Sequence, residues 1–306
     1  MKILSLFDGM GGARVALHNL GVVPEIYATS EINSHAISVT DNRWGNFLKL
    51  GDITKIIDNR NLMRELGSHK WDLMIFGSPC TDLSVARKNR ESLAGKNSGL
   101  FYRAIELWDA LRPTHFLMEN VASMSAESEQ EISEILGEVP YLINSRYFTG
   151  QHRERLYWCN WTANDYKPQQ PVWFRDKLLP FNELMREKEK LSISQAGKEY
   201  MLRKTADGRD HYAFGHHSNT DKPYSACVVA NFKKGVPYNV LLDYRNHQAG
   251  PWIRRFHPVE CERLQGFPDR YTEGLGFNRA WTPRYEMIGN SFTVPVIEYL
   301  LKPIIK

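Results

Sequence analysis

The chain has 306 residues, of which 42% are hydrophobic and 24% are charged, and its formal net charge is +4. This composition is that of a globular protein and excludes a disordered chain, which combines low hydrophobicity with high net charge. No apolar run approaches the roughly 20 residues that a membrane helix needs, so we do not expect an integral membrane protein. The small excess of positive charge allows a polyanionic partner without requiring one.

The chain start and the cysteines indicate a reducing compartment. The start, MKILSLFDGMGG, carries one Lys and a short apolar run that leads into glycines, which is typical of a first strand rather than of a signal peptide. The four cysteines are scattered without a CxxC pair, so they indicate neither a zinc site nor a disulfide framework. We therefore expect a cytoplasmic protein without a bound metal. The cysteines are Cys80, Cys159, Cys227 and Cys261.

Short apolar segments alternate with helical patterns through the first half of the chain. Strands that alternate with helices form a parallel sheet with helices on both faces. The pattern therefore predicts an α/β protein with a mostly parallel, doubly wound sheet. The expected strands are residues 2–7, 24–30, 71–76, 114–118 and 155–161, and the expected helices are residues 11–20 and 99–111.

The pattern changes after about residue 160. Residues 162–254 contain six prolines and mix aromatic, basic and turn residues without the alternation of strands and helices. The sequence becomes helical again from Pro258 and ends in an apolar segment that can pack on a core. We predict a small lobe at residues 162–254 and a larger domain made of residues 1–161 and 255–306.

The first motif is FDGMGG at residues 7–12, between an expected strand and an expected helix. Glycines there let the backbone approach a ligand closely, although such a turn alone can also bind nothing. Glu31 ends the next strand about 20 residues later, where a carboxylate can bind ribose hydroxyls. Asp52 and Ile53 could read an adenine amino group and pack on its ring, although Asp52 alone is more typical of a helix cap. Together these features predict a cofactor that carries adenosine.

The second motif is GSPC at residues 77–80. It places the Cys80 thiol at the carboxyl end of a parallel strand, where open α/β sheets carry their active sites. A free cysteine is more often a buried structural residue. However, Pro79 stiffens the turn, and residues 81–99 are polar, basic and glycine-containing, which favours a loop beside a nucleophile.

The third and fourth motifs supply a carboxyl and two guanidinium groups. Glu119 directly follows the expected strand 114–118, which could be a neighbour of the strand before Cys80. A carboxyl group at this position needs a partner or has a raised pKa. In QHRER at residues 151–155, alternation along a strand puts Arg153 and Arg155 on one face. The two arginines can then pair with Glu119 and orient it. Alone, the arginine cluster would be interpreted as a surface ion-pair patch.

These motifs, in this order, resemble the cytosine-C5 DNA methyltransferases. The resemblance covers residues 1–161 and 255–306, about two thirds of the chain, and the ordered set is far more specific than any one block. The strings SPCTDLS, ARK and ERLQGFP look closer to the catalytic domain of the vertebrate de novo methyltransferases than to the typical bacterial restriction-system enzymes. The blocks are FDGMGG, the acidic residue Glu31, GD at 51–52, GSPC at 77–80, MENV at 118–121, QHRER at 151–155, PVECERLQGFP at 258–268 and GNSFTVPV at 289–296.

The resemblance implies the class I adenosylmethionine-dependent methyltransferase fold with a small target-recognition lobe. It implies methyl transfer from S-adenosyl-L-methionine to C5 of a cytosine that is flipped out of double-stranded DNA. Cys80 would attack C6, Glu119 would manage the proton at N3, Arg155 would contact O2, and Arg153 would brace the cysteine loop. The implied cofactor-binding residues are Phe7, Asp8, Gly9, Gly11, Gly12, Glu31, Asp52, Ile53, Pro79, Asn290 and Ser291.

The resemblance also implies DNA contacts from two segments. One is the loop at residues 81–99, and the other is a basic tip in the small lobe, with Phe232 beside its lysines and Arg254 and Arg255 at its exit. Ordinary surface charge explains the two lysines equally well. The expected contact residues are Val85, Arg87, Lys88, Arg90, Lys233 and Lys234.

Two residues depart from the pattern of many bacterial members. Ile32 stands where they carry an aromatic residue, so the stack on adenine is weaker or comes from Phe7 or Ile53. Thr81 stands where they carry Gln, so the contacts of the loop differ from theirs.

Three other functions compete with this hypothesis. A tRNA cytosine-C5 methyltransferase could use the same scaffold, and a catalytically silent relative could hold DNA without methylating it. An NAD-dependent dehydrogenase would fit the first glycines and Glu31 but would leave Cys80 and Glu119 unexplained. We expect a bacterial or phage-encoded protein of the restriction–modification type that acts on DNA without a membrane, with a monomer favoured.

Overall fold

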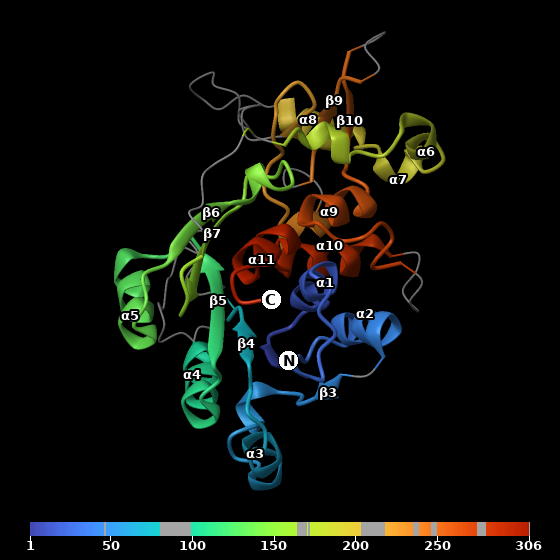
Figure 1. The fold of residues 1–306 in the computed structure, drawn as a ribbon. Coiled ribbons are helices and arrows are strands. Elements are labelled where there is room, and N and C mark those ends of the chain that lie inside the picture. The colour runs from blue at the N-terminus through green and yellow to red at the C-terminus, as the bar shows by residue number, and fades with distance from the viewer. Residues whose placement is uncertain are drawn as a thin grey trace. The chain divides into compact units, whose positions relative to one another are not determined.

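The structure is a computed structural model that describes residues 1–45, 47–79, 99–163, 170, 172–202, 218–234, 239–245, 250–273 and 280–305. Contacts divide the chain into two compact units. The first unit comprises Met1–Ile143, Glu154–Tyr166 and Ile297–Lys306, and the second comprises Asn144–Arg153 and Lys167–Val296. Figure 1 draws both, and each is described here by itself.

A seven-stranded, mostly parallel sheet organises the first unit. β1 is parallel to its neighbours β2 and β4, and β4 is parallel to β5, whereas β7 is antiparallel to β5. The strand order β3-β2-β1-β4-β5-β7-β6 changes direction between β1 and β4, which is where open α/β sheets bind ligands. This topology confirms the predicted fold class. The strands are β1 (Lys2–Leu6), β2 (Ile26–Ser30), β3 (Leu48–Lys49), β4 (Leu73–Phe76), β5 (His115–Val121), β6 (Tyr141–Asn144) and β7 (Glu154–Cys159).

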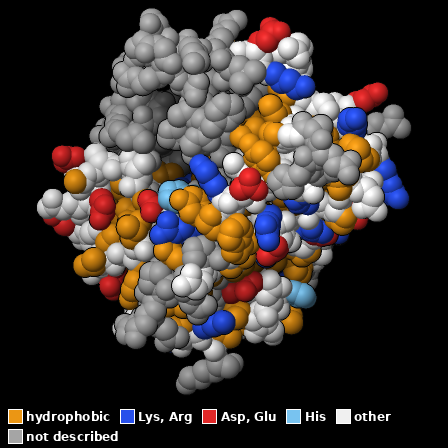
Figure 2. Space-filling view, turned by 90° about the horizontal axis from the view of Figure 1, so that it is seen from above, with side chains coloured by type: hydrophobic (Ala, Val, Ile, Leu, Met, Phe, Trp, Pro, Cys, Tyr) orange, Lys and Arg blue, Asp and Glu red, His pale blue; other side chains and the backbone are white. Residues whose placement is uncertain are grey.

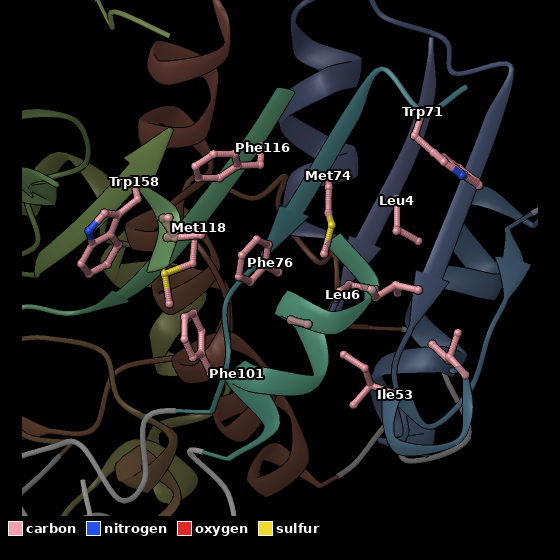
Figure 3. Packing of buried hydrophobic residues seen from close by; sticks show 14 of the residues in the cluster. Leu4, Leu6, Ile53, Trp71, Met74, Phe76, Phe101, Phe116, Met118 and Trp158 are labelled. Carbon is pink, nitrogen blue, oxygen red and sulfur yellow. The ribbon is translucent and has the colours of Figure 1, made fainter. Parts of the chain in front are cut away.

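Apolar side chains from the strands and the helices form one core. All four residues of β4 are buried, as expected for a strand that is covered on both faces. Figure 3 shows Met74 and Phe76 of this strand in one cluster with Phe101 of the following helix and with Ile53. The elements of this unit outside the sheet are α1 (Gly12–Asn19), α2 (Ser34–Trp44), η1 (Ile53–Lys55), α3 (Arg60–Gly67), α4 (Leu100–Leu111) and α5 (Ala126–Leu136).

Three helices of this unit were not among the predicted elements. Each begins at a polar residue whose side chain accepts hydrogen bonds from the first free backbone N–H groups of the helix. The capping residues are Asn33 before α2, Asn59 before α3 and Ser125 before α5. Such capping residues are the sequence signal that locates these helices. The strand expected at residues 114–118 continues to Val121, so Glu119 lies within β5 rather than after it.

The second unit combines a small sheet with short helices. β9 lies between β8 and β10, parallel to the first and antiparallel to the second. Its strands are β8 (Ser218–Asn219), β9 (Leu241–Asp243) and β10 (Trp252–Arg254). Its helical elements are η3 (Ser145–Tyr147), η4 (Phe174–Lys177), α6 (Phe181–Met185), α7 (Lys188–Leu191), α8 (Gln195–Leu202), η6 (Ala230–Lys234), α9 (Pro258–Gln265) and α10 (Trp281–Asn290), and the division between the units falls within α11 (Val294–Leu301).

The segment 255–296 packs with the middle of the chain. A Cβ atom placed on Gly289 of α10 would lie 2.2 Å from the carbonyl carbon of Val229 and 2.3 Å from the amide nitrogen of Ala230. Only glycine therefore lets α10 approach the segment that enters η6 so closely. The compact units thus divide the chain differently from the functional lobe predicted at residues 162–254, and that lobe stays a prediction.

Candidate active site

The turn after β4 lies beside β5 at the carboxyl edge of the sheet. Phe76 pairs with Met118, so the residues that follow β4 lie next to Glu119 and Asn120. The Asn120 side-chain amide donates a hydrogen bond to the Ser78 hydroxyl at 3.2 Å, and both side chains are buried. The two strands that were expected to bring the thiol and the carboxyl together are therefore neighbours. Cys80 itself lies outside the described residues.

Glu119 forms an ion pair with Arg155. Arg155 Nε lies 3.1 Å from Glu119 Oε1, and the side chains are 15% and 13% exposed, respectively. In the antiparallel pair of β5 and β7, Glu119 faces Tyr157 and Val121 faces Arg155, so the two charged side chains are diagonal neighbours on one face. The ion pair that the sequence predicted between these residues is present, and it fixes the direction of the carboxyl.

Arg153 occupies a different environment from Arg155. It precedes β7, belongs to the second unit and is almost completely buried. Its guanidinium donates to the carbonyl oxygens of Val228 at 2.9 Å, Gly289 at 3.3 Å and Ser291 at 3.0 Å. The prediction that alternation puts Arg153 on one face with Arg155, directed at Glu119, is therefore wrong: β7 begins at Glu154, and backbone carbonyls take the donors of Arg153.

Two buried glutamines connect three of the sequence blocks. Gln151 Nε2 donates to the Leu264 carbonyl at 2.9 Å, and Gln265 Nε2 donates to the Ile288 carbonyl at 2.9 Å. The Thr293 hydroxyl donates to Gln265 Oε1 at 3.0 Å. Sequence reasoning gave these glutamines no role. No sequence signal marks them, because only the structure shows that these amides are fully buried and must find partners for their donors and their acceptor.

The turn between β1 and α1 has strained backbone. Phe7, Gly9 and Gly11 have positive φ angles of 55°, 57° and 79°. Glycine adopts this region freely, whereas an aromatic residue adopts it only where its surroundings impose it, and such strain is concentrated at ligand sites. The strained Phe7 therefore marks this turn as a candidate ligand site, and the cofactor contacts expected of it stay a prediction.

Asp8 lies buried beneath this turn. Its Oδ1 atom accepts hydrogen bonds from the Ser5 hydroxyl at 2.5 Å and from the Tyr27 hydroxyl at 2.7 Å, whereas its buried Oδ2 atom has no hydrogen-bond partner among the described residues. Burial raises the pKa of Asp8 to about 6, although the two hydroxyl donors oppose the rise. A bound ligand with a hydroxyl or ammonium group is one way to satisfy the orphaned oxygen.

Glu31 connects the glycine turn to the end of β2. Its Oε2 atom accepts the N–H of Gly9 at 2.8 Å, and its Oε1 atom accepts those of Ile32 and Asn33 at 2.8 and 2.7 Å. A carboxylate has about four acceptor positions, so these bonds leave about one for a ligand. This carboxylate could then accept about one hydrogen bond from a ribose, whereas the sequence predicted that it binds both ribose hydroxyls.

Asp52 caps the short helix η1. Its Oδ1 atom accepts the Thr54 N–H at 3.0 Å and the Thr54 hydroxyl at 2.8 Å, and the backbone bond is the main reason that the pKa of Asp52 is lowered. Ile53 is buried in the hydrophobic core (Figure 3). A cavity of about 280 Å³ lies next to these residues, with Glu31, Leu50 and Gly51 in its wall.

The remaining cofactor residues divide between the two units. Pro79 is half-buried in the first unit, while Ser291 is buried and Asn290 exposed in the second. The Ser291 carbonyl is bonded to Arg153 and, at 3.2 Å, to Gln265. Within the described part of the chain, no group of three or more His, Cys, Asp or Glu side chains could hold a metal ion. No helix among the same residues is long and apolar enough to cross a membrane.

The expected basic tip has less unpaired positive charge than its sequence indicates. Phe232 is buried between Phe256 and Tyr285, and Lys233 is paired with Glu286 at 2.7 Å. Lys234 is exposed. On the face that Figure 2 draws, Lys and Arg side chains are interspersed with acidic and hydrophobic ones. Val85, Arg87, Lys88 and Arg90 lie outside the described residues.

Arg254 is not available to a phosphate, contrary to what the sequence suggested. It is completely buried and bonded to Asp243 at 2.9 Å and to both carboxylate oxygens of Glu260 at 2.8 and 2.9 Å. A buried guanidinium is stable only with such partners. Arg254 therefore joins β9, β10 and α9 within the second unit.

Comparison with known proteins gives one family. The family model of the C-5 cytosine-specific DNA methylases matches residues 1–306. The type II methyltransferase M1.ScrFI of Lactococcus lactis subsp. cremoris is 27% identical over 322 residues, which cover 100% of this chain and 78% of that protein. M.HpaII of Haemophilus parainfluenzae is 27% identical, with 99% and 88% coverage. The crystal structure of the S. pombe Dnmt2 methyltransferase superposes with a TM-score of 0.70 at 18% identity and covers 99% of both chains. The chain belongs to the C-5 cytosine-specific DNA methylase family, as its ordered motifs predicted.

Proposed function

We propose that this cytosine methyltransferase transfers a methyl group from S-adenosylmethionine to C5 of a cytosine flipped out of double-stranded DNA, through a covalent bond from Cys80 to C6. Membership of the family supports methyl transfer to cytosine C5. The observation that carries the mechanism is the ion pair of Glu119 and Arg155 on β5 and β7, beside the turn that leads to Cys80.

Cytosine C5 is a poor nucleophile, so the enzyme must first make this carbon more nucleophilic. Addition of the Cys80 thiolate to C6 forms an S–C6 bond and turns the ring into an enamine, so that C5 can attack a methyl group. S-adenosylmethionine supplies that methyl group on an electrophilic sulfonium. Loss of the C5 proton to solvent then breaks the S–C6 bond, which releases the thiolate and restores the aromatic ring. Asn120 supports this chemistry by holding Ser78, two residues before the thiol.

Glu119 and Arg155 stabilise the charge that the addition creates. Negative charge builds on N3 and O2 of the ring, and Glu119 offsets it by sharing a proton with N3. Arg155 holds Glu119 and contacts O2. Because the pair is mostly shielded from water, its electrostatic effect on the ring is greater than it would be at an exposed site. That Arg153 braces the cysteine loop stays part of the proposal, and backbone carbonyls hold its guanidinium.

The residues around the glycine turn fit S-adenosylmethionine. Phe7, Gly9, Gly11 and Gly12 form the cradle, while the orphaned Asp8 oxygen and the remaining acceptor of Glu31 are available to ammonium or hydroxyl groups. Asp52 and Ile53 would lie at the adenine, with Pro79, Asn290 and Ser291 completing the site. The cradle and both carboxyl groups belong to the first unit.

The nucleic-acid partner is proposed to be double-stranded DNA, as expected for an enzyme that extrudes a base from the stack. Residues 162–254 would recognise the target sequence, with Lys233 and Lys234 and the loop residues Val85, Arg87, Lys88 and Arg90 near phosphates. A cytoplasmic, monomeric restriction–modification enzyme fits relatives such as the type II methyltransferases. A tRNA methyltransferase and a silent DNA-binding relative are the alternatives.

One experiment separates these functions. The protein is incubated with methyl-labelled S-adenosylmethionine and, in parallel, with genomic DNA or total tRNA, and the methylated base is then identified. We expect 5-methylcytosine in DNA alone. Label in tRNA alone would replace the DNA proposal, and binding of S-adenosylmethionine without any transfer would support the silent relative.

A further inference from the structure

Three segments of the second unit form one surface, and the proposed function gives none of its residues an individual role, although two of the segments lie within the predicted target-recognition lobe. They are residues 144–152, 172–177 and 221–225. Backbone hydrogen bonds join them: Val172 N–H to the Arg146 carbonyl at 3.2 Å, Phe174 N–H to the Pro223 carbonyl at 2.9 Å, and His152 N–H to the Ser225 carbonyl at 3.0 Å. We call this the three-segment surface.

Two aromatic rings of this surface face outward because the positions beside them are buried. Phe174 is fully buried, whereas its neighbour Trp173 is 42% exposed. Ser225 is buried, whereas its neighbour Tyr224 is 37% exposed. The segments also touch at the backbone, since a Cβ atom on Gly150 would lie 2.6 Å from the Val172 carbonyl oxygen. The packed interior thus leaves the two rings in the solvent.

Each exposed ring has a cation or an imidazole beside it. The Arg175 guanidinium lies 5.0 Å from the centre of the Trp173 ring. The Arg146 guanidinium lies 5.9 Å from the centre of the Tyr224 ring, and the His152 ring lies 5.6 Å from it. A cation over a ring is attracted to its negative face and restricts the motion of both side chains. The rings are therefore supported before any ligand binds.

The charge of the surface is positive. Its unburied Arg and Lys residues outnumber its acidic residues by four to two. Among the described residues of these segments, the exposed large hydrophobic side chains are both aromatic, without an aliphatic companion. A nucleic acid presents both negative phosphates and flat bases, which match the positive charge and the aromatic rings of this surface. The cations are Arg146, Arg175, Lys177 and Lys222, and the acidic residues are Asp176 and Asp221.

We propose that the three-segment surface binds single-stranded nucleic acid, with unpaired bases stacked on Trp173 and Tyr224 and the backbone phosphates near Arg146 and Arg175. Surfaces of this kind combine cations that follow the phosphates with aromatic side chains on which successive bases stack. A duplex hides its base faces in the stack, so exposed rings add little to its binding. The proposal therefore goes beyond methylation of duplex DNA.

Binding of a labelled twelve-nucleotide oligothymidylate, measured by fluorescence anisotropy without cofactor, tests this inference. Trp173→Ala and Tyr224→Ala should each weaken binding by about tenfold or more, because stacking on a ring is lost. Trp173→Phe and Tyr224→Phe retain a ring and should bind much more tightly than the alanine variants. Arg175→Ala should lower the slope of log affinity against log salt by about 0.7.

The controls distinguish this surface from general effects. Leu142→Ala removes an exposed apolar side chain of the first unit and should leave the affinity unchanged. Thermal unfolding of each variant verifies that it is folded. The inference is overturned if folded alanine variants bind oligothymidylate as the wild type does, or if they lose as much affinity for the matching duplex. Because oligothymidylate contains no cytosine, binding and methyl transfer can fail independently of each other.

Discussion

Two arginines in the two units show how differently the same side chain is used. Arg155 belongs to the sheet unit, forms an ion pair with Glu119 and keeps 15% of its side chain exposed. Arg254 belongs to the second unit, is fully buried and is paired with both Asp243 and Glu260. Hydrogen bonds from Arg245 and the Arg254 charge keep the pKa of Asp243 below its ordinary value, although burial alone would raise it. We propose that the partly exposed ion pair serves the chemical step in the first unit, whereas the fully buried ion pairs stabilise the fold of the second.

The largest effect should come from Glu119. Glu119→Gln keeps a hydrogen-bonding side chain opposite Arg155 but cannot manage the N3 proton in the same way, so the methylation rate should fall by about 10²–10⁴. Single-turnover kinetics with duplex DNA measure this rate, and a gel shift should show little change in DNA affinity. Equal turnover in the variant and the wild type would remove Glu119 from the mechanism.

Arg254 should affect stability rather than the chemical step. Arg254→Met would leave the buried Glu260 without its guanidinium partner, while Asp243 keeps Arg245, and breaking such a buried pair costs about 3–5 kcal/mol. Urea unfolding measures this loss. Arg103→Met is the matched control, because Arg103 forms an exposed ion pair with Glu106, and such pairs contribute about 0–1 kcal/mol. Similar losses of unfolding free energy in both variants would show that the buried ion pair stabilises the fold no more than the exposed one does.

Asp8 should make stability depend on pH. Because its pKa is raised to about 6, the native protein holds a proton that the unfolded chain has already released between about pH 4 and pH 6. The free energy of unfolding should therefore fall as the pH rises through that window, by up to about 3 kcal/mol. Asp8→Asn, which keeps a carbonyl acceptor for Ser5 and Tyr27, should lack this fall, as unfolding curves at several pH values would show. An identical pH dependence in both proteins would mean that Asp8 is not the titrating group.

The smallest effect should come from the two lysines of η6. Replacing Lys233 and Lys234 together with Ala should weaken duplex binding and reduce its salt slope by up to about 2, since each phosphate contact contributes about 0.9. The pairing of Lys233 with Glu286 makes the change smaller still. S-adenosylmethionine affinity should stay constant. An unaltered salt slope would show that these lysines are ordinary surface charge.

The sequence predicted the sheet well because its signals are local. Apolar runs such as residues 71–76 and the glycine turn at residues 7–12 each determine their own conformation, and the ordered motifs identified the family. The environment of an arginine side chain, in contrast, depends on residues that are far away in the sequence. Arg153 stands two residues before Arg155, yet its partners Val228 and Gly289 are far along the chain, and only tertiary packing shows that backbone carbonyls surround it.

The second unit was less predictable for the same reason. Its helices are short, and buried polar residues far apart in sequence hold its parts together. Gln151 bonds to the Leu264 carbonyl, and Arg254 bonds to Asp243 and Glu260. No periodicity marks such residues, because a buried arginine or glutamine has the same place in a pattern as an exposed one.

The most direct test of the central claim is trapping of the covalent complex. The wild type is incubated with S-adenosylmethionine and duplex DNA that contains 5-fluorocytosine, which has no C5 proton to release, and the complex is resolved on a denaturing gel. We predict a stable adduct with the wild type and none with a folded Cys80→Ala variant, because only the thiolate can form the bond to C6. An adduct of equal yield in Cys80→Ala would contradict the account.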